Sequence, residues 1–361
     1  MVPEVKPIDG TPAAAGYRMP AEFEPHATTW LAWPHKEESW PGKLDRIPSI
    51  WVEMVRALSP GERVNILVNE AAPEEEVRSR LRAAGVSLAN VRCLRVPTND
   101  AWIRDSGPIF LTRASVAGTD LAVVDWEYNA WGGKYPPWDD DNRIPDHIAA
   151  MLDVPIFRPG IVMEGGSIDV NGQGTVLTTE ACLLNPNRNP QLRRSDIERH
   201  LRDFLGVRHI LWLGEGIAGD DTDGHVDDLT RFVGPSTVVT ALEDDPGDAN
   251  YAPLQANYRR LHEMTDQDGR PLQVIPLPMP APIYHQGLRL PASYANFYIG
   301  NSAVLLPTFD QPTDAVAHAI LRRLFPGRAV VGIYATDFVW GLGACHCATQ
   351  QQPVSRHVED T

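Results

Sequence analysis

The 361-residue sequence has few cysteines, no excess of positive charge and no long apolar run. Four cysteines in so long a chain do not suggest a disulfide framework, so we expect reduced thiols and a cytoplasmic protein without a secretory leader. Basic residues number 32 against 47 acidic ones, and the formal net charge of −15 argues against nucleic-acid binding and suits a cationic partner. No stretch approaches the roughly 20 apolar residues that span a bilayer, so no membrane association is expected.

Strand-like and helix-like segments alternate along the chain and predict a mixed α/β fold. Apolar residues at i, i+3, i+4 and i+7 over 47–58 predict a helix. Asn189-Pro190 is typical of a helix start, ahead of a helix that ends at Gly206, and Pro312 begins another. No linker rich in Gly, Ser or Pro divides the sequence, so we expect a single domain over 1–361. Apolar and β-branched runs predict strands at 63–68, 121–126, 175–179, 237–240, 272–275 and 329–334.

Residues capable of chemistry recur at a nearly constant interval. Asp105 and Glu164 each begin an acid-x-Gly-x-Ile segment, and they are 59 residues apart (164 − 105). His225 follows 61 residues later (225 − 164), and Cys347 lies 122 beyond it (347 − 225), which is twice 61. The interval favours a repeated module in which each copy delivers one group to a shared centre. Chance also produces such spacings, and the flanking sequences barely align.

The segment 343–353 places two thiols and an imidazole side by side, as Cys345-His346-Cys347. A cysteine attacks as the thiolate and needs a base or a positive charge nearby. In an extended segment Cys345 and Cys347 would point one way and His346 the other, so the base is expected elsewhere, with His225 best placed by motif. The alternatives are a zinc site, which would need a second pair of ligands, and two half-buried structural thiols.

Several carboxylates accompany the thiol. A guanidinium presents its N–H donors in a flat fork that carboxylates can hold, so Asp105 and Asp227 are candidate clamps. Glu164, followed by two glycines, is a candidate to orient His225, and Trp102 a candidate pocket wall. The structural alternatives are an Asp105–Arg104 pair or an Asx turn, a solvated Asp227, an exposed Glu164, a buried structural His225 and a core Trp102. Two further loops, 131–134 and 185–190, receive no role from chemistry alone.

Eight segments spread over nearly the whole chain resemble those of bacterial agmatine deiminases, guanidine-modifying enzymes of the pentein fold. The resemblance implies a five-bladed α/β propeller with pseudo-fivefold symmetry, built from five modules of roughly 60–70 residues in one catalytic domain. The segments are 19–26, 30–35, 102–108, 129–135, 163–167, 221–227, 294–298 and 346–351.

The resemblance also implies roles for individual residues. It selects Cys347 over Cys345 as the nucleophile, because the family nucleophile directly follows the His of this motif. Leu342 interrupts a run that is often glycine in the family, and Cys345 replaces an aliphatic residue. These two departures are expected to alter the shape of the pocket near the nucleophile relative to the family. The other implied catalytic positions are Asp105, Glu164, His225 and Asp227, and those at the amine end of the substrate are Trp102 and Asp221.

The expected reaction is the hydrolytic deimination of agmatine to N-carbamoylputrescine and ammonia, a step of putrescine and polyamine metabolism, through a thiouronium intermediate on Cys347. The expected partner is a small cationic guanidino compound, with no metal or organic cofactor, and a homodimer is a family-level expectation. One alternative is a deiminase of arginine, methylated arginine or peptidyl arginine. The carboxylate of such a substrate would be expected to pair with an Arg in the pocket. The other is a non-catalytic pentein binding factor, which would not need Cys347, His225 and Glu164 together.

Overall fold

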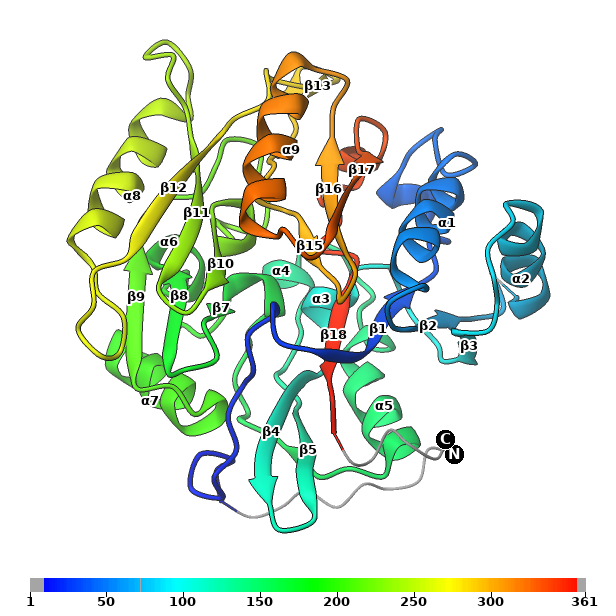
Figure 1. The fold of residues 1–361 in the computed structure, drawn as a ribbon, viewed down its shortest axis with the longest axis horizontal. Helices are drawn as coiled ribbons and strands as arrows, with labels where there is room; N and C mark the ends of the chain where they lie inside the picture. Colours follow the sequence, from blue (N-terminus) through cyan, green and yellow to red (C-terminus); the bar gives the residue numbers. More distant parts are fainter. Residues whose placement is uncertain (1–9, 72, 356–361) are drawn as a thin grey trace.

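The computed structural model describes residues 10–71 and 73–355 as a mixed α/β structure whose sheets surround a common centre (Figure 1). Within this part of the chain, five sheets share one pattern: an antiparallel pair of strands is followed by a helix and a strand parallel to the second of the pair. The strands of the first three such sheets are β4 (Ile109–Ser115), β5 (Gly118–Val124) and β6 (Ile156–Phe157), then β7 (Asp169–Val170), β8 (Thr175–Thr179) and β9 (His209–Leu213), then β10 (Thr230–Gly234), β11 (Thr237–Leu242) and β12 (Gln273–Pro278).

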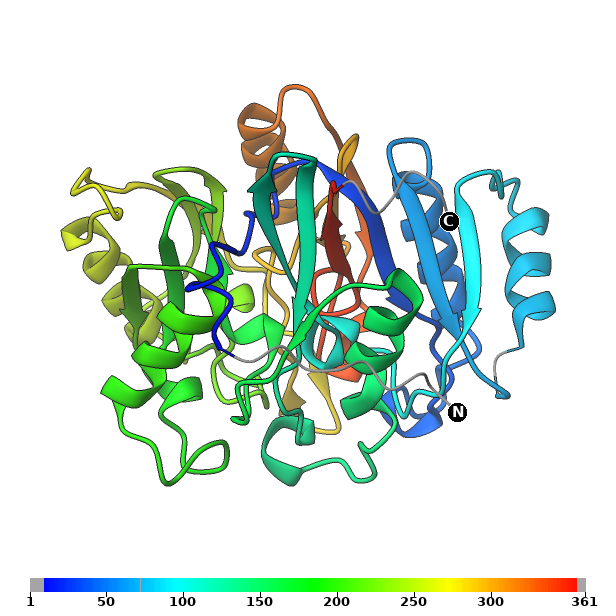
Figure 2. The same cartoon turned by 90° about the horizontal axis from the view of Figure 1, so that it is seen from below.

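The two ends of the described chain meet in one sheet. The fourth repeat comprises β15 (Tyr298–Ile299), β16 (Ala303–Thr308) and β17 (Ala329–Tyr334). The fifth pairs β18 (Gln350–Pro353) antiparallel with β1 (His26–Ala32), which is followed by the parallel strands β2 (Arg63–Val68) and β3 (Val91–Arg95). Trp30 pairs with Gln350, and the Trp30 indole donates to Gln352 Oε1 at 2.9 Å. This sheet therefore closes the ring, as the adjacent red and blue strands show in Figure 2.

The pseudo-fivefold α/β architecture expected from the resemblance is thus confirmed. A single domain over 1–361 stays a prediction, and 1–9, 72 and 356–361 lie outside the described residues. A separate two-stranded hairpin joins β13 (Tyr284–His285) to β14 (Leu288–Arg289). Among the helices of 10–71 and 73–355, none combines the length and apolar composition that crossing a bilayer requires.

The longer helices lie on the outside of the ring and bury one apolar face against the sheets (Figure 1). Helix α1 buries all six apolar positions that its periodicity marked, from Ile47 to Leu58, which confirms that prediction. The five outer helices are α1 (Ile47–Leu58), α5 (Ile144–Leu152), α7 (Arg194–Leu205), α8 (Tyr251–Glu263) and α9 (Pro312–Leu324), and α2 (Glu74–Ala83) precedes β3. The short helices α3 (Ile103–Ser106), α4 (Ala130–Gly133) and α6 (Glu180–Leu183) belong to connecting loops.

One predicted helix start is wrong. Asn189-Pro190 does not begin α7, which starts at Arg194, where Asp196 Oδ2 accepts the backbone N–H of Arg193 at 3.1 Å. The Asn189 amide instead bonds the backbone of Val162, so this segment holds two loops together. The helix ends at Gly206 as predicted, and Pro312 begins α9.

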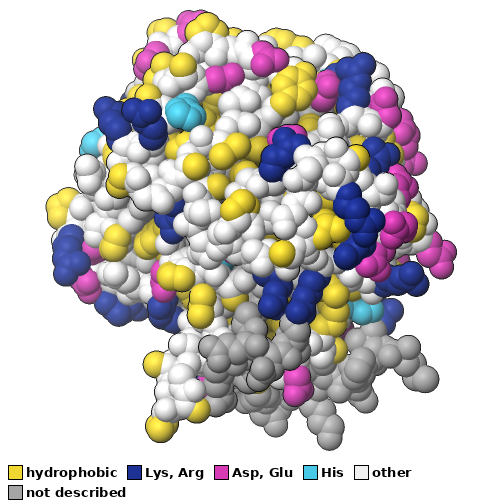
Figure 3. Space-filling view, turned by 45° about the vertical axis from the view of Figure 1, so that its right-hand side comes forward, with side chains coloured by type: hydrophobic (Ala, Val, Ile, Leu, Met, Phe, Trp, Pro, Cys, Tyr) yellow, Lys and Arg dark blue, Asp and Glu magenta, His cyan; other side chains and the backbone are white. Residues whose placement is uncertain are grey.

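The six predicted strands all exist, with small errors at their ends. Those at 63–68, 175–179 and 329–334 match β2, β8 and β17, whereas β5 starts and ends earlier than 121–126. On the face shown in Figure 3, Lys and Arg side chains lie among Asp and Glu side chains. Helix α2 is an example, since Arg80 pairs with Glu76 at 3.0 Å. Mixed surface charge of this kind is typical of a solvated face.

Gly206 and Gly85 offer a matched test of the helix ends. Both have positive φ (68° and 73°), but an added Cβ at Gly206 would lie 2.5 Å from the Tyr17 carbonyl oxygen, whereas nothing lies within 4 Å at Gly85. We expect Gly85→Ala to cost about 1 kcal/mol of unfolding free energy, from the left-handed conformation alone. Gly206→Ala should cost clearly more, and equal denaturation midpoints for the two variants would contradict this.

Candidate active site

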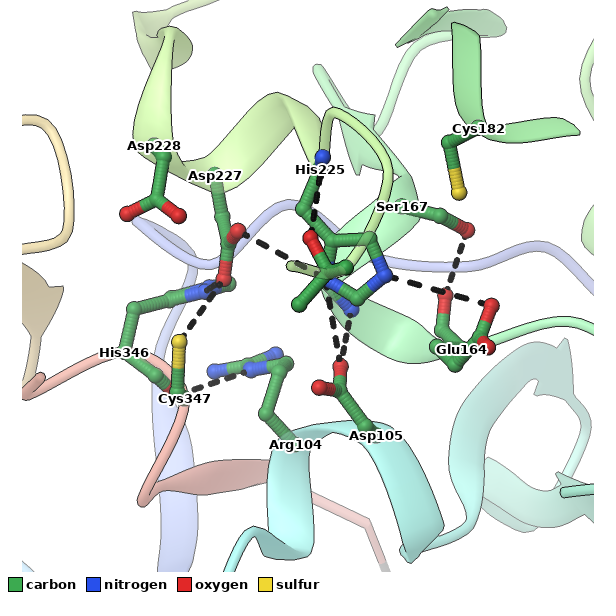
Figure 4. Close-up of polar contacts among 12 residues, drawn as sticks. Arg104, Asp105, Glu164, Ser167, Cys182, His225, Asp227, Asp228, His346 and Cys347 are labelled. Atoms are coloured by element: carbon green, nitrogen blue, oxygen red, sulfur yellow. Dashed lines mark hydrogen bonds and ion pairs between the residues drawn. The ribbon is translucent and has the colours of Figure 1, made fainter. Parts of the chain in front are cut away.

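The site is built from the loops that precede the first strand of each repeat, and these loops meet at the centre of the ring (Figure 4). Helix α3 before β4 carries Asp105, the loop before β7 carries Glu164, and the loop before β10 carries His225 and Asp227. The turn before β18 carries Cys347. The structure thus brings together the five predicted catalytic side chains, each from the same place in its repeat.

Cys347 lies in a turn rather than in an extended segment, which corrects the predicted geometry. The backbone N–H of Ala348 donates to the carbonyl of Ala344 at 3.2 Å, so Cys345 and Cys347 do not share one face as they would in a strand. Cys345 is fully buried in the apolar core, while Cys347 is 5% exposed and lines a cavity. Burial raises the pKa of the Cys347 thiol well above its ordinary value, and the neighbouring Asp227, Asp228 and Asp105 raise it further. An empty site therefore favours the thiol over the thiolate.

Asp105 and Asp227 both face the Nδ1 atom of His225. The His225 Nδ1 atom is 3.8 Å from Asp105 Oδ1 and 3.9 Å from Asp227 Oδ1, and the Cys347 sulfur is 3.6 Å from Asp227 Oδ2. The nucleophile candidate and the base candidate are thus both neighbours of one carboxylate. Burial raises the pKa of Asp105, and Asp227 and Glu164 raise it further while His225 opposes them. These carboxylates therefore repel one another across a space that suits a cation.

Glu164 lies behind His225, and Arg188 holds it there. Glu164 Oε2 is 3.9 Å from His225 Nε2, while Oε1 accepts the Arg188 Nε–H at 2.7 Å. Burial alone would lower the pKa of His225, but Asp105, Cys182 and Glu164 outweigh it and raise that pKa well above its ordinary value. Arg188 comes from the 185–190 loop, to which the sequence assigned no role. Its function here is to balance the buried Glu164 charge.

A cavity of about 140 Å³ opens from Cys347 toward the surface. Asp105 and Cys347 lie at its inner end, Trp102 stacks on Phe338 along its wall, and Asp221 also lines it. Both predicted substrate-binding residues therefore line the same cavity as Asp105 and Cys347. The remaining lining residues are Lys36, Glu38, Ser39, Asp100, Trp131, Tyr135, Thr222, Trp340, Gly341, Leu342 and Gly343.

Trp131 belongs to the second loop that received no role. Ala130 and Trp131 both adopt left-handed backbone conformations, with φ of 51° and 56°, which are unfavourable for residues other than glycine. The turn directs the Trp131 indole N–H to Asp105 Oδ2 at 2.9 Å, and the Gly166 N–H donates to Asp105 Oδ1 at 2.8 Å. Asp105 is thereby held in one orientation. The Trp131-Gly132-Gly133 run was the sequence signal for this loop.

Asn296 is the residue that the sequence interpretation missed. It precedes β15 in the fourth repeat, 71 residues after His225 (296 − 225) and 51 before Cys347 (347 − 296), so it lies off the regular spacing. Its amide nitrogen donates to the Cys347 sulfur at 3.0 Å and to Asp228 Oδ1 at 2.9 Å, and its oxygen accepts the His346 N–H at 2.9 Å. The motif 294–298 contained the signal, but a lone Asn carries no specific chemistry.

Glu164, Cys182 and His225 are the one group in 10–71 and 73–355 whose ligand atoms are arranged as metal donors, all within 4.8 Å of one another. The Arg188 guanidinium already bonds the same Glu164 carboxylate, and that side chain is fully buried beside it. A divalent cation would therefore add a second buried positive charge next to the first. We assign no metal to this group.

The left-handed conformation of Leu342 explains why a glycine suits this position. Leu342 has φ of 65° and ψ of 22° at the end of the short helix Phe338–Gly341, and its side chain lines the cavity. Leu therefore adds both backbone strain and a wall to the pocket at this point. The departure from glycine lies at the cavity wall and not at the reacting group.

The sequence model of the Porphyromonas-type peptidyl-arginine deiminase family matches residues 18–353. This chain belongs to that family. The family assignment and the long resemblance to agmatine deiminases noted in the sequence are thereby confirmed, and the chain is an enzyme of the class that hydrolyses C–N bonds.

Similar relatives match nearly the whole chain. It is 40% identical to an agmatine deiminase of Pseudomonas aeruginosa (strain LESB58), with 96% of this chain and 98% of that protein covered. It is 40% identical to an agmatine deiminase of Ectopseudomonas mendocina, with 95% and 97% covered. A solved agmatine deiminase of Enterococcus faecalis superposes with a TM-score of 0.90 at 35% identity, covering 96% of this chain and 99% of that one.

Gly166 tests how closely the site is packed. An added Cβ would lie 2.6 Å from His225 Nδ1 and 2.8 Å from Asp105 Oδ1. Because a displacement of about 1 Å in a catalytic group costs roughly a hundredfold in rate, Gly166→Ala should lower kcat/KM for the deiminated substrate by about that factor. Gly327→Ala, where nothing lies within 4 Å, should leave it unchanged. Ammonia-release kinetics on both variants decide, and an active Gly166→Ala enzyme would refute the packing argument.

Proposed function

We propose that this chain hydrolyses agmatine to N-carbamoylputrescine and ammonia, with Cys347 as the nucleophile. The observation that carries the proposal is the cavity of about 140 Å³ that ends at Cys347 among buried carboxylates and has another carboxylate, Asp221, on its wall. A molecule with a flat cation at one end and an amine at the other complements this distribution of charge.

Asp105 and Asp227 hold the guanidinium in this proposal. Asp105 already accepts two hydrogen bonds from the protein, while Asp227 Oδ1 is buried and has no hydrogen-bond partner among the described residues. A buried carboxylate oxygen without a donor is costly, and a guanidinium N–H would satisfy it. The cation also offsets the mutual repulsion that raises the pKa of Asp105.

The bound cation also activates the thiol. Burial and the surrounding carboxylates raise the pKa of the Cys347 thiol in the empty site. The guanidinium brings a positive charge that lowers this pKa, so the thiol loses its proton to solvent when the substrate binds. The sulfur then attacks the guanidinium carbon and forms a C–S bond. His225, protonated because its pKa is raised, donates its proton to the departing nitrogen, and ammonia leaves behind a thiouronium.

Water completes the reaction. Neutral His225, held by Glu164, takes a proton from the water whose oxygen attacks the thiouronium carbon. The C–S bond breaks, the electron pair returns to sulfur, and the adduct loses its hydroxyl proton as the urea product forms. No step of this reaction needs an oxidant, a reductant or a metal ion.

The outer part of the cavity favours an amine over a carboxylate at the far end of the substrate. Glu38, Asp100 and Asp221 line the cavity, and no Arg among residues 10–71 and 73–355 does. Lys36, the one Lys or Arg among the described lining residues, is 3.5 Å from Asp100 and so already faces an acid. Arginine, methylated arginine and peptidyl arginine present a carboxyl or backbone group where these acids lie. The cytoplasmic compartment and the homodimer stay predictions.

Exchange of the two neighbouring thiols tests the nucleophile. Cys347→Ser should lower kcat by roughly a thousandfold or more, because the thiolate forms the covalent intermediate. Cys345→Ser, in the fully buried core, should retain most of the turnover. Mass spectrometry after a haloacetamidine reagent should place the adduct on Cys347. The reverse pattern would move the nucleophile by two residues.

Asp221→Asn tests the substrate. The loss of one charge-assisted hydrogen bond costs about 1.5–3 kcal/mol, so KM for agmatine should rise by roughly tenfold or more while KM for arginine changes little or falls. Asp244→Asn, an exposed acid outside the cavity, is the matched control. An equal rise of KM for agmatine and for arginine would argue that Asp221 supports the fold and does not bind the amine.

A further inference from the structure

His346 lies between two buried carboxylates, and the mechanism above does not use it. Its Nδ1 atom is 2.7 Å from Asp227 Oδ2, and its Nε2 atom is 2.8 Å from Glu22 Oε2. All three side chains are at most 7% exposed. Figure 4 shows the imidazole directly below Asp227, beside Cys347. The imidazole ring of His346 is therefore almost entirely shielded from water.

Two hydrogen bonds of this length need two protons. A carboxylate oxygen only accepts, and a neutral imidazole carries one N–H and one lone pair. With a neutral ring and two ionised carboxylates, one ring lone pair would face an anion within 2.8 Å, which is repulsive. The three groups together must therefore hold two protons, either both on His346 or one on His346 and one on a carboxyl group.

Glu22 is not the carboxyl group that holds a proton. Its Oε1 accepts the Arg231 guanidinium and the Ile299 N–H, each at 2.8 Å, and Arg104 donates to its Oε2 at 3.1 Å. Burial alone would raise the pKa of Glu22, but Arg231, His346 and Arg104 outweigh it and hold that pKa well below its ordinary value. The choice is then between a proton on His346 and one on Asp227.

The surroundings of Asp227 favour the proton on His346. The Cys347 sulfur also donates to Asp227 Oδ2 at 3.6 Å, so this oxygen already serves as an acceptor. Burial raises the pKa of Asp227, whereas the charges of His225 and Arg231, which do not depend on the state of His346, lower it. A guanidinium at the free Asp227 Oδ1 would lower it again. The titratable and charged groups that face Asp227 are Asp105 from α3, Cys347 and His346 from the turn before β18, Arg231 from β10, and Asp220, His225 and Asp228 from its own loop.

We propose that Glu22 and His346 are positioning residues: the imidazole, protonated on both nitrogens and anchored by Glu22, keeps Asp227 ionised and turns its Oδ1 atom to the substrate. The proposal rests on the function proposed above, in which Asp227 clamps a guanidinium. His346 fixes one oxygen of the carboxylate, so the other is left without a partner and available. This role also explains the segment 19–26, which reaches the centre of the ring through Glu22.

Two variants separate the charge of His346 from its hydrogen bonds. His346→Asn places an amide N–H near the former Nδ1 atom and keeps a donor to Asp227, whereas His346→Gln keeps a donor only toward Glu22. Both remove the positive charge, so the pKa of Asp227 rises and the acidic limb of kcat/KM moves to higher pH. The loss is then largest at low pH and shrinks as pH rises, and His346→Gln should also raise KM more than His346→Asn, by roughly tenfold.

A purely structural role predicts a different result. Activity would fall by one factor at every pH, with the acidic limb unmoved, and that outcome in both variants would overturn the proposal. His209→Gln is the control, since His209 bonds a backbone carbonyl at 2.9 Å in β9 and faces no catalytic group. Its pH profile should match that of the parent enzyme.

A second measurement does not depend on turnover. In Cys347→Ser protein labelled with ¹⁵N-histidine, the His346 ring should show two protonated nitrogens at neutral pH. The signal is assigned by its loss in the Cys347→Ser/His346→Asn double variant. One protonated and one bare nitrogen would refute the proposal even if the enzyme is active. Two protonated nitrogens in a parent protein that releases no ammonia from any guanidine would instead refute the proposed function.

Discussion

The burial of several carboxylates around one small cavity is the constraint on which the rest of the site depends. Asp105, Glu164 and Asp227 are all inaccessible to solvent or nearly so, and like charges in a poorly solvated space raise one another's pKa values. Each charge is balanced differently. Arg188 neutralises Glu164, His346 supports Asp227, and His225 faces both Asp105 and Asp227 while the Asp227 Oδ1 atom keeps no hydrogen-bond partner among the described residues.

The fold provides this convergence through repetition. Each repeat sends the loop before its first strand to the centre of the ring, so five loops that are distant in sequence contribute side chains to one site, and the loop before β10 contributes two. The closure of β18 on β1 is essential to this arrangement, because Cys347 lies three residues before β18. Without that pairing the turn that carries Cys347 would have no fixed place opposite Asp227.

Burial also links binding to chemistry. The empty site raises the pKa of the Cys347 thiol, which protects the sulfur from reaction until a cation enters. The same carboxylates that disfavour the thiolate in the empty site attract the guanidinium. A neutral molecule of the same shape would enter without lowering the pKa of the thiol. In the proposed mechanism, selectivity for cations is therefore a property of Cys347 as well as of the pocket wall.

The sequence by itself determined the helix of 47–58, the strands at 63–68, 175–179 and 329–334, and the residue types of the site, because periodicity, turn residues and side-chain chemistry are local properties. Motif spacing indicated Asp105, Glu164, His225 and Cys347 but passed over Asn296, whose longer spacing reflects the hairpin β13–β14 inserted before it. The catalytic roles of these residues stay predictions.

Only the tertiary structure decided how those residues meet. The turn at 345–348, where an extended segment was expected, gives His346 its place between Glu22 and Asp227. Likewise, Asn189 bridges two loops instead of starting a helix, and Arg188 reaches Glu164. Each of these outcomes depends on partners far away in the chain, and sequence patterns describe a residue's neighbours along the chain and not those across the ring.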